Sequence, residues 1–246
     1  IVDVLSDELE VTSRDLERTG VRVLPIIADV SRLDQVEEMV NRTESELGSI
    51  DILVNCAGVL QAIGPVWELD PMAWLREISV NLCGTFLCCR AVARRMVEQG
   101  HGYILNMLGG GVGDPHPYTT GYACSKAGIM RLTEGLAREV HEYGVKVFGM
   151  QPGATRTALT EFIMNSPEGQ RWRRTFRRIF DQGRDSPAEE VAALAVALVS
   201  GRADALSGRY IPATADLDAL VARADEIVAQ DLWTLRIRGE AMDEAL

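Results

Sequence analysis

A tyrosine and a lysine, Tyr122 and Lys126, stand four residues apart just after a loop rich in glycine and proline. The residues that follow, 127–140, are typical of a helix, and on a helix this spacing places both side chains on one face. A phenol in water has a pKa of about 10 and exchanges protons poorly at neutral pH. A neighbouring ammonium group stabilises the phenolate and lowers that pKa. The pair therefore predicts general acid/base chemistry at Tyr122.

The lysine itself supports this interpretation, because the chain contains 2 lysines against 23 arginines. A compact ammonium suits this chemistry, whereas a planar guanidinium does not. The motif alone also fits a tyrosine and a lysine on a solvated helix face. That alternative stays open until the surrounding elements are considered.

The composition is that of one α/β domain without a polyanionic partner. The chain has 246 residues, and 47% of them are hydrophobic, which allows a sizeable core. Its net charge of -11 argues against nucleic-acid binding, and no apolar stretch reaches the roughly 18 residues of a membrane span. Five cysteines without metal-ligand spacing indicate reduced, buried thiols in a cytoplasmic protein and no metal site.

Short apolar segments alternate with helical segments along the chain. We expect strands over residues 1–4, 21–30, 50–58, 102–107, 145–153 and 208–214. We expect helices over residues 7–18, 31–47, 71–79 and 81–98, from residue 122 onward, and after a capping box at 186–189. This alternation predicts a Rossmann-type doubly wound parallel sheet in three layers. Residues 1–215 form this domain, and residues 216–246 form its C-terminal helical extension.

Chemistry in such a sheet lies beyond the carboxyl ends of the strands. Asp3, Asp29, the turn at Asn55, the glycine loop at Gly109 and Pro152 all stand at such ends. The expected fold therefore gathers these residues near Tyr122.

In this order the motifs resemble those of the short-chain dehydrogenase/reductase family, over nearly the whole chain up to about residue 215. The resemblance implies that Tyr122 is the catalytic tyrosine and that Lys126 binds the nicotinamide ribose and lowers the pKa of that tyrosine. Asn81 matches the helix asparagine that holds a water in the family's proton relay. The turn at 55–58 is similar to the family's Asn-Asn-Ala-Gly motif, and the segment 152–157 resembles the one that contacts the nicotinamide amide. The cofactor-binding residues that the resemblance implies are Asp3, Asp29, Val30, Asn55, Ala57, Gly58, Tyr122, Lys126, Pro152, Gly153 and Thr157.

Two carboxylates bear on the choice of cofactor. Asp3, at the end of the family's second strand, is placed to accept hydrogen bonds from the adenosine ribose and would repel a 2′-phosphate, which favours NAD over NADP. Asp29 and Val30 resemble the pair on the adenine side of the family's cofactor site. For both carboxylates the alternative is a cap on the next turn or helix.

The chain departs from the family at Gly109, where the proton relay has a serine about thirteen residues before the tyrosine. Loss of one such donor typically costs about 2.7 to 4 kcal/mol of transition-state stabilisation. The backbone N–H groups of Gly109 to Gly111 are one alternative donor. The hydroxyls of Thr119 and Thr120 are a weaker one.

A second departure is that the family's first strand and glycine-rich pyrophosphate turn would precede Ile1. That strand is central in the family's sheet and carries the phosphate cradle. We therefore expect the chain to be an N-terminally truncated piece that binds NAD poorly by itself. Fluorescence titration with NADH, with and without upstream residues, tests this expectation.

A basic cluster lies where the family has its substrate-binding loop. It indicates either an anionic substrate, such as a carboxylate or phosphate, or a solvated helix face or subunit contact. In the second case Trp172, Phe176 and Ile179 form the buried side of the helix. Among the histidines, His116, in the loop before Tyr122, is the one best placed to face a substrate. The cluster consists of Arg171, Arg173, Arg174, Arg177 and Arg178.

The function expected from the resemblance is hydride transfer between a secondary alcohol or carbonyl carbon and NAD. Tyr122 is the general acid/base, Lys126 tunes it, and Asn81 supports the relay. The helices over 81–98 and 122–143 resemble those through which the family forms homodimers and homotetramers. The alternative is a non-catalytic nucleotide-binding or scaffold protein that has lost the serine.

Overall fold

The computed structural model describes residues 1–237. The strands are β1 (Val2–Asp3), β2 (Ile26–Ile27), β3 (Ile52–Asn55), β4 (Gly102–Met107), β5 (Val145–Gln151) and β6 (Tyr210–Pro212). The first helices are α1 (Ser6–Glu17), α2 (Leu33–Leu47), α3 (Pro71–Glu77), α4 (Gly84–Gln99) and α5 (Thr120–Glu139). The later helices are α6 (Ala158–Asn165), α7 (Pro167–Trp172), α8 (Arg177–Asp181), α9 (Ala188–Leu198), α10 (Leu217–Ala222) and α11 (Ala224–Ala229).

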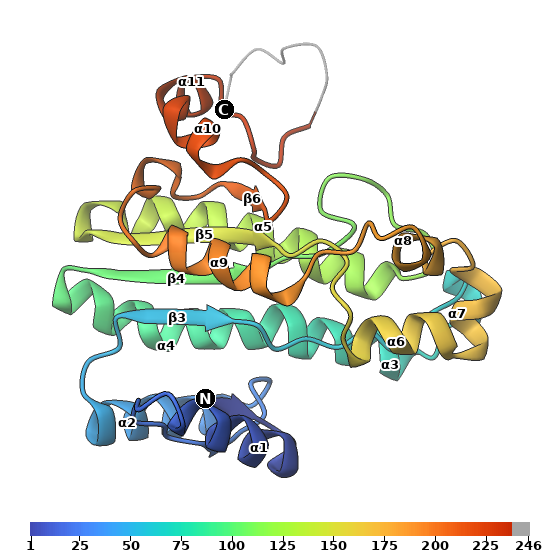
Figure 1. Cartoon of the computed structure of the whole chain (residues 1–246), viewed down its shortest axis with the longest axis horizontal. Coiled ribbons are helices and arrows are strands. Elements are labelled where there is room, and N and C mark those ends of the chain that lie inside the picture. The colour runs from blue at the N-terminus through green and yellow to red at the C-terminus, as the bar shows by residue number, and fades with distance from the viewer. Residues whose placement is uncertain (238–246) are drawn as a thin grey trace.

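The strands of the described residues pair in parallel and form two sheets. β1 pairs with β2, and β3, β4, β5 and β6 follow one another in the second sheet. The carboxyl ends of the second sheet point toward α6 and α7 (Figure 1). The loops at this edge are therefore the ones that can build a site.

Helices cover both faces of the second sheet, as the sequence predicted. Successive strand residues point to opposite faces, and the core follows this alternation. Ile104 and Val147 pack in one cluster with residues of α2 and α4. Leu105 and Phe148 pack in another with α9, α10 and α11. Figure 1 shows α9 on one side of β4 and β5, with α4 and α5 on the other.

A gap separates the two sheets between β1 and β3. Val2 and Val54 line a hollow of about 210 Å³ there. Ile52 and Val54 on β3 are each 47% exposed, which is unusual for apolar strand residues.

Several elements are shorter than predicted. The strand expected over 21–30 is reduced to β2, since Pro25 has no N–H to donate to a neighbouring strand. α2 begins without a side-chain cap, and the Ser31 hydroxyl donates to Asp29 Oδ1 at 2.6 Å. The capping box expected at Ser186 is absent, and α9 also starts without a side-chain cap.

In the predicted helical extension, α10 and α11 are the helices and end at Ala229, residues 230–237 are not helical, and residues 238–246 lie outside the described residues. Of the five cysteines expected to be buried, Cys88 and Cys89 are, and burial raises their thiol pKa values to about 11 and about 12. Cys56, Cys83 and Cys124 are exposed, because they lie on a turn and on outward helix faces. Residues 1–237 contain no helix long and apolar enough to cross a membrane.

Candidate active site

Tyr122 and Lys126 lie on the first turns of α5 and face one cleft, as the spacing predicted. The Lys126 side chain is 3% exposed, and its Nζ donates to the Met107 carbonyl oxygen at 2.9 Å. Nζ lies 5.5 Å from the centre of the Tyr122 ring. The cleft measures about 310 Å³ and opens between the carboxyl ends of β4 and β5. A solvated helix face, the alternative for this pair, does not describe a buried lysine and a half-buried tyrosine.

Burial dominates the protonation of the pair. It raises the pKa of Tyr122 to about 12, with further increases from the negative charges of Glu77 and Cys56. Burial also lowers the pKa of Lys126 to about 8, so the ammonium form still prevails at neutral pH. The expectation that Lys126 lowers the pKa of Tyr122 is not met in the chain alone, because burial and the negative charges of Glu77 and Cys56 raise that pKa.

The Tyr122 side chain leaves no room for a side chain at position 109. A Cβ atom on Gly109 would stand 2.2 Å from the Tyr122 hydroxyl oxygen and 2.8 Å from Cζ. Any side chain there would displace the tyrosine. The serine that the sequence lacks is therefore excluded by the present position of the phenol, which occupies that space itself.

Thr119 and Thr120, considered as substitutes for the family's serine, do not line the cleft. The Thr119 hydroxyl is buried and lies 3.4 Å from His116 Nδ1. The Thr120 hydroxyl accepts a hydrogen bond from Trp74 Nε1 at 3.1 Å. Of the two alternatives to the serine hydroxyl, the backbone N–H groups of Gly109 to Gly111 are the one left to donate a hydrogen bond to a substrate oxygen.

Asn81 is fully buried in a π-helical segment, Ile78–Cys83, between α3 and α4. Its Oδ1 accepts from the Val59 N–H at 2.7 Å, and its Nδ2 donates to the Val59 carbonyl and to Ser125 Oγ. Single π-turns inside helices often occur at functional sites. The structure thus makes Asn81 a clamp between the turn after β3 and α5.

The turn at 55–58 is anchored to the sheet. Asn55 Nδ2 donates to Asn106 Oδ1 at 2.8 Å, and Asn106 Nδ2 donates to Thr133 Oγ1 at 2.9 Å. A Cβ atom on Gly58 would lie 3.4 Å from Asn81 Oδ1 and 3.7 Å from Lys126 Nζ. The turn therefore brings its backbone against both of these side chains, while Ala57 lines the hollow between the sheets.

The other wall of the cleft is formed by the segment that the resemblance assigns to the nicotinamide amide. Pro152, Gly153 and Thr157 line it, and Gly153 has a φ of 76°, which a glycine adopts without strain. Thr155 Oγ1 also belongs to this wall and is buried without a hydrogen-bond partner among the described residues. Buried polar atoms are nearly always paired, so a carboxamide here would satisfy it. Sequence reasoning missed Thr155, which carries no motif signal.

The residues expected on the adenosine side behave differently from one another. Asp3 ends β1 with an exposed carboxylate that accepts from the Leu5 N–H at 2.9 Å. Asp29 accepts from Ser31 and pairs with Arg76 at 3.0 Å, and these contacts hold the pKa of its carboxyl below the usual range. Asp29 thus matches the capping alternative, while Val30 packs against Gly84 beside the hollow between the sheets.

The basic cluster does not line the cleft. It lies on two short helices, α7 and α8, and in the turn between them. Arg173 Nη2 lies 2.5 Å from His116 Nε2, and burial together with this cation lowers the pKa of His116 to about 4. Trp172 and Phe176 pack on Leu60 in a buried cluster, as the amphipathic alternative predicted, whereas Ile179 is half-buried and lies outside that cluster.

Glu77 is a buried carboxylate beside the site that sequence reasoning did not select. Its Oε1 accepts from the N–H groups of Gln61 and Ala62 at 2.6 and 2.8 Å, and its Oε2 has no partner among the described residues. A Cβ atom on Gly121 would lie 2.3 Å from Oε2. Glu77 therefore joins the loop after β3 to the start of the helix that carries Tyr122, and burial raises its pKa.

Replacing Glu77 by glutamine is expected to alter the pH dependence of stability. Because the pKa of Glu77 is raised in the folded state, ionisation costs stability as pH rises above the range of a free carboxyl group. Glutamine cannot ionise, and its oxygen can still accept both N–H bonds. The Tm of Glu77→Gln relative to the unmodified protein should be more favourable at about pH 8 than at about pH 4. Glu8→Gln, on the exposed face of α1, serves as the control, and an identical pH trend in both variants would contradict this assignment.

Comparison with known proteins agrees with the fold. A family profile described as short chain dehydrogenase matches residues 1–167. The chain therefore belongs to the short chain dehydrogenase family, whose members similar to it are named as dehydrogenases and reductases.

Individual relatives extend this likeness over most of the chain. D-threitol dehydrogenase of Mycolicibacterium smegmatis is 34% identical over 73% of this chain and 67% of its own length. Levodione reductase of Leifsonia aquatica is 32% identical over 86% of this chain and 81% of its own length. The crystal structure of a gluconate 5-dehydrogenase from Burkholderia cenocepacia, in complex with NADP and tartrate, has a TM-score of 0.76 at 28% identity. It covers 89% of this chain and 84% of that one.

Proposed function

We propose that the chain is an NAD(P)-dependent oxidoreductase that transfers a hydride between a nicotinamide cofactor and a secondary alcohol or carbonyl substrate. One observation carries this proposal. The Tyr122 phenol and the buried Lys126 ammonium converge on a cleft whose opposite wall presents Gly153 and the unpaired Thr155 hydroxyl.

In carbonyl reduction, Tyr122 donates its proton to the oxygen of the substrate, and in alcohol oxidation its phenolate accepts the alcohol proton. The cofactor, when bound, supplies or accepts the hydride. Lys126, whose Nζ lies 5.5 Å from the centre of the Tyr122 ring, is assigned the stabilisation of the phenolate during the reaction, and Asn81 holds the neighbouring loop in place. The backbone N–H groups of Gly109 to Gly111 are the proposed donors to the substrate oxygen in place of the family's serine.

Deuteride transfer tests this function directly. The chain is incubated with NADH carrying deuterium at the reactive carbon and with a panel of cyclic and acyclic ketones. We expect one deuterium on the carbinol carbon of at least one product, measured by mass spectrometry. Absence of transfer with every ketone, and with NADPH as well, would favour the alternative of a non-catalytic nucleotide-binding or scaffold protein.

The preference for NAD over NADP rests on Asp3 alone, and the NADP in the gluconate 5-dehydrogenase structure does not support it. The carboxylate of Asp3 is exposed at the end of β1 and would repel a 2′-phosphate. Replacing Asp3 by alanine should raise the ratio of kcat/KM for NADPH to that for NADH by about tenfold or more. Asp7→Ala, on α1, is the matched control. An unchanged ratio in Asp3→Ala would remove the basis of the NAD preference.

The proposal includes a small-molecule substrate, a cytoplasmic location and a homodimer or homotetramer built through α4 and α5. Phe86 on α4 is 47% exposed and supports such a contact. An anionic substrate finds no support in the cleft, since the arginines of the basic cluster do not line it.

A further inference from the structure

A second cavity lies at the opposite end of the sheet from Tyr122. It measures about 520 Å³ and opens where α5 ends, β5 begins and the chain approaches β6. Position 138 on α5 lies about 24 Å along the helix from position 122, at about 1.5 Å per residue. The cavity is therefore separate from the candidate active site. Its charged lining residues are Glu134, Arg138, Lys146, Asp204, Arg209, Asp231 and Arg236.

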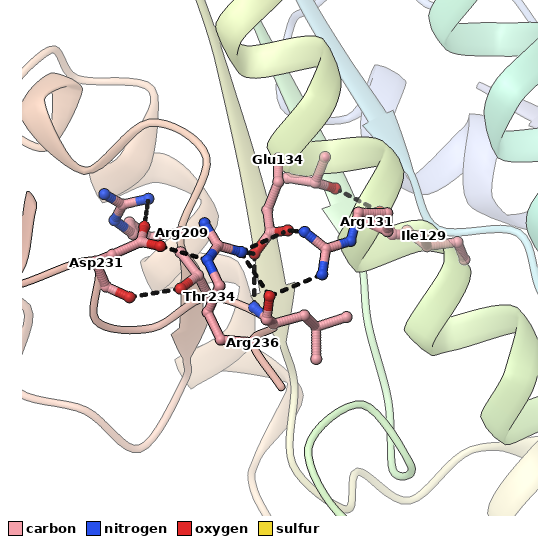
Figure 2. Close-up of polar contacts among 9 residues, drawn as sticks. Ile129, Arg131, Glu134, Arg209, Asp231, Thr234 and Arg236 are labelled. Atoms are coloured by element: carbon pink, nitrogen blue, oxygen red, sulfur yellow. Dashed lines mark hydrogen bonds and ion pairs between the residues drawn. The ribbon is translucent and has the colours of Figure 1, made fainter. Parts of the chain in front are cut away.

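Two of the three carboxylates of this cavity are already paired with cations. Glu134 is 6% exposed and accepts from Arg131, from Arg236 and from the Leu235 N–H. Asp231 pairs with Arg236, and Figure 2 shows Arg236 between Glu134 and Asp231. The third, Asp204, accepts a hydrogen bond from the Tyr103 hydroxyl at 3.1 Å.

The cations of this cavity have fewer ion-pair and hydrogen-bond partners than its carboxylates. Arg209 is 12% exposed, and its Nη1 reaches Asp231 only at 3.6 Å. Its buried Nε finds no acceptor among the described residues. Burial lowers the pKa of Arg209, and the positive charges of Arg236 and Arg138 act in the same direction against the raising effect of Asp231 and Glu134.

Two more cations line the cavity without ion pairs. Neither Arg138 nor Lys146 pairs with a carboxylate within residues 1–237. Lys146 is the second of the 2 lysines of the chain, and the active-site cleft does not use it. Four cations thus face three carboxylates in a protein whose net charge is -11.

A comparison within the molecule shows that clustered arginines alone do not produce this imbalance. Another hollow, between α2 and α4, is lined by Arg90, Arg94 and Arg95. There each arginine has a carboxylate partner, at 3.4, 3.7 and 2.5 Å respectively. The uncompensated positive charge distinguishes the cavity beside β6 from this hollow.

We propose that this cavity binds the phosphate group of a small molecule or inorganic phosphate itself. A phosphate dianion presents several strong acceptor oxygens, which suit the unpaired Arg209 Nε, Arg138 and Lys146. It would also relieve the repulsion between the guanidinium groups. The volume is within the range of small-ligand sites and larger than phosphate alone needs.

Isothermal titration calorimetry of the chain with inorganic phosphate and with glycerol 3-phosphate, at constant ionic strength, tests this site. We expect both probes to bind, and the tighter one distinguishes a free anion from a phosphate ester. Lys146→Ala and Arg138→Ala should each raise the Kd by about tenfold or more. Circular dichroism confirms that both variants remain folded, and either variant alone suffices for the test.

Arg94→Ala is the matched control, because it removes the same charge from the hollow between α2 and α4. Its Kd for phosphate should remain within about twofold of the unmodified protein. Absence of binding by both probes overturns the proposal. So does an equal weakening in Arg94→Ala, or unchanged binding in both Lys146→Ala and Arg138→Ala.

Discussion

Tyr122→Phe is expected to lower kcat by about 100- to 10,000-fold, the range typical for loss of a general acid/base. The phenyl ring retains the contacts that Tyr122 makes with the buried cluster around Leu60 and Ile163, so the fold and KM should change little. The loss should therefore fall on kcat, which is the signature of an interaction made in the transition state.

The pH profile gives an independent test of the same assignment. Burial raises the pKa of Tyr122 to about 12, so the phenol form prevails at neutral pH. Carbonyl reduction uses the phenol form, so titration of Tyr122 should leave the rate of reduction nearly unchanged around neutral pH. Alcohol oxidation uses the phenolate, and its rate should rise with pH toward the pKa of Tyr122. The rise should vanish in Tyr122→Phe.

Tyr118→Phe is the matched control. Tyr118 lies in the loop just before α5, and its ring stacks on Trp172 with centroids 4.9 Å apart. Phenylalanine preserves that stacking, so kcat should stay within about threefold of the unmodified enzyme. Comparable losses in the two variants, or a Tyr122→Phe enzyme that retains its rate, would refute the role of the Tyr122 hydroxyl.

Gly109→Ser is expected to reduce activity, although it restores the residue type found in the family's proton relay. The new Cβ would stand 2.2 Å from the Tyr122 oxygen, far inside van der Waals contact, so the phenol must move. Displacement of a catalytic group by about 1 Å can cost about 100-fold in rate. We expect kcat/KM to fall by about that factor.

The neighbouring glycine loop supplies the control for this substitution. A Cβ atom on Gly113 would meet no atom within 4 Å, so Gly113→Ser should leave kcat/KM nearly unchanged. An increase in kcat/KM for Gly109→Ser would mean that the added hydroxyl outweighs the displacement. Tyr122 would then have an alternative position that this structure does not show.

Much of the fold and the central pair could be predicted from sequence because their signals are local. The strand at 102–107 was predicted with its observed bounds, since its apolar run is flanked by Gly102 and by the glycine loop. The four-residue spacing of Tyr122 and Lys126 fixes their common helix face wherever the helix packs. Chain order alone also predicts that the Asn-Cys-Ala-Gly turn lies near Tyr122 and Lys126. The same holds for Pro152 and Gly153, which stand at the end of a strand.

The remaining features depended on segments that are far apart in sequence. Glu77 became part of the site because α3 packs against both the loop after β3 and the start of α5. The pKa of Tyr122 rises because neighbouring segments exclude water from it, a quantity that no spacing encodes.

The sequence by itself determined which chemical groups this protein has and the order in which parallel strands deliver them to one edge. Only the tertiary structure decided that the Tyr122 hydroxyl fills the space beside Gly109 and that Asp29 pairs with Arg76. It also placed Lys146 in a positively charged cavity at the far end of the sheet. The physical reason is that burial and charge act through space, between residues whose separation along the chain gives no measure of their distance.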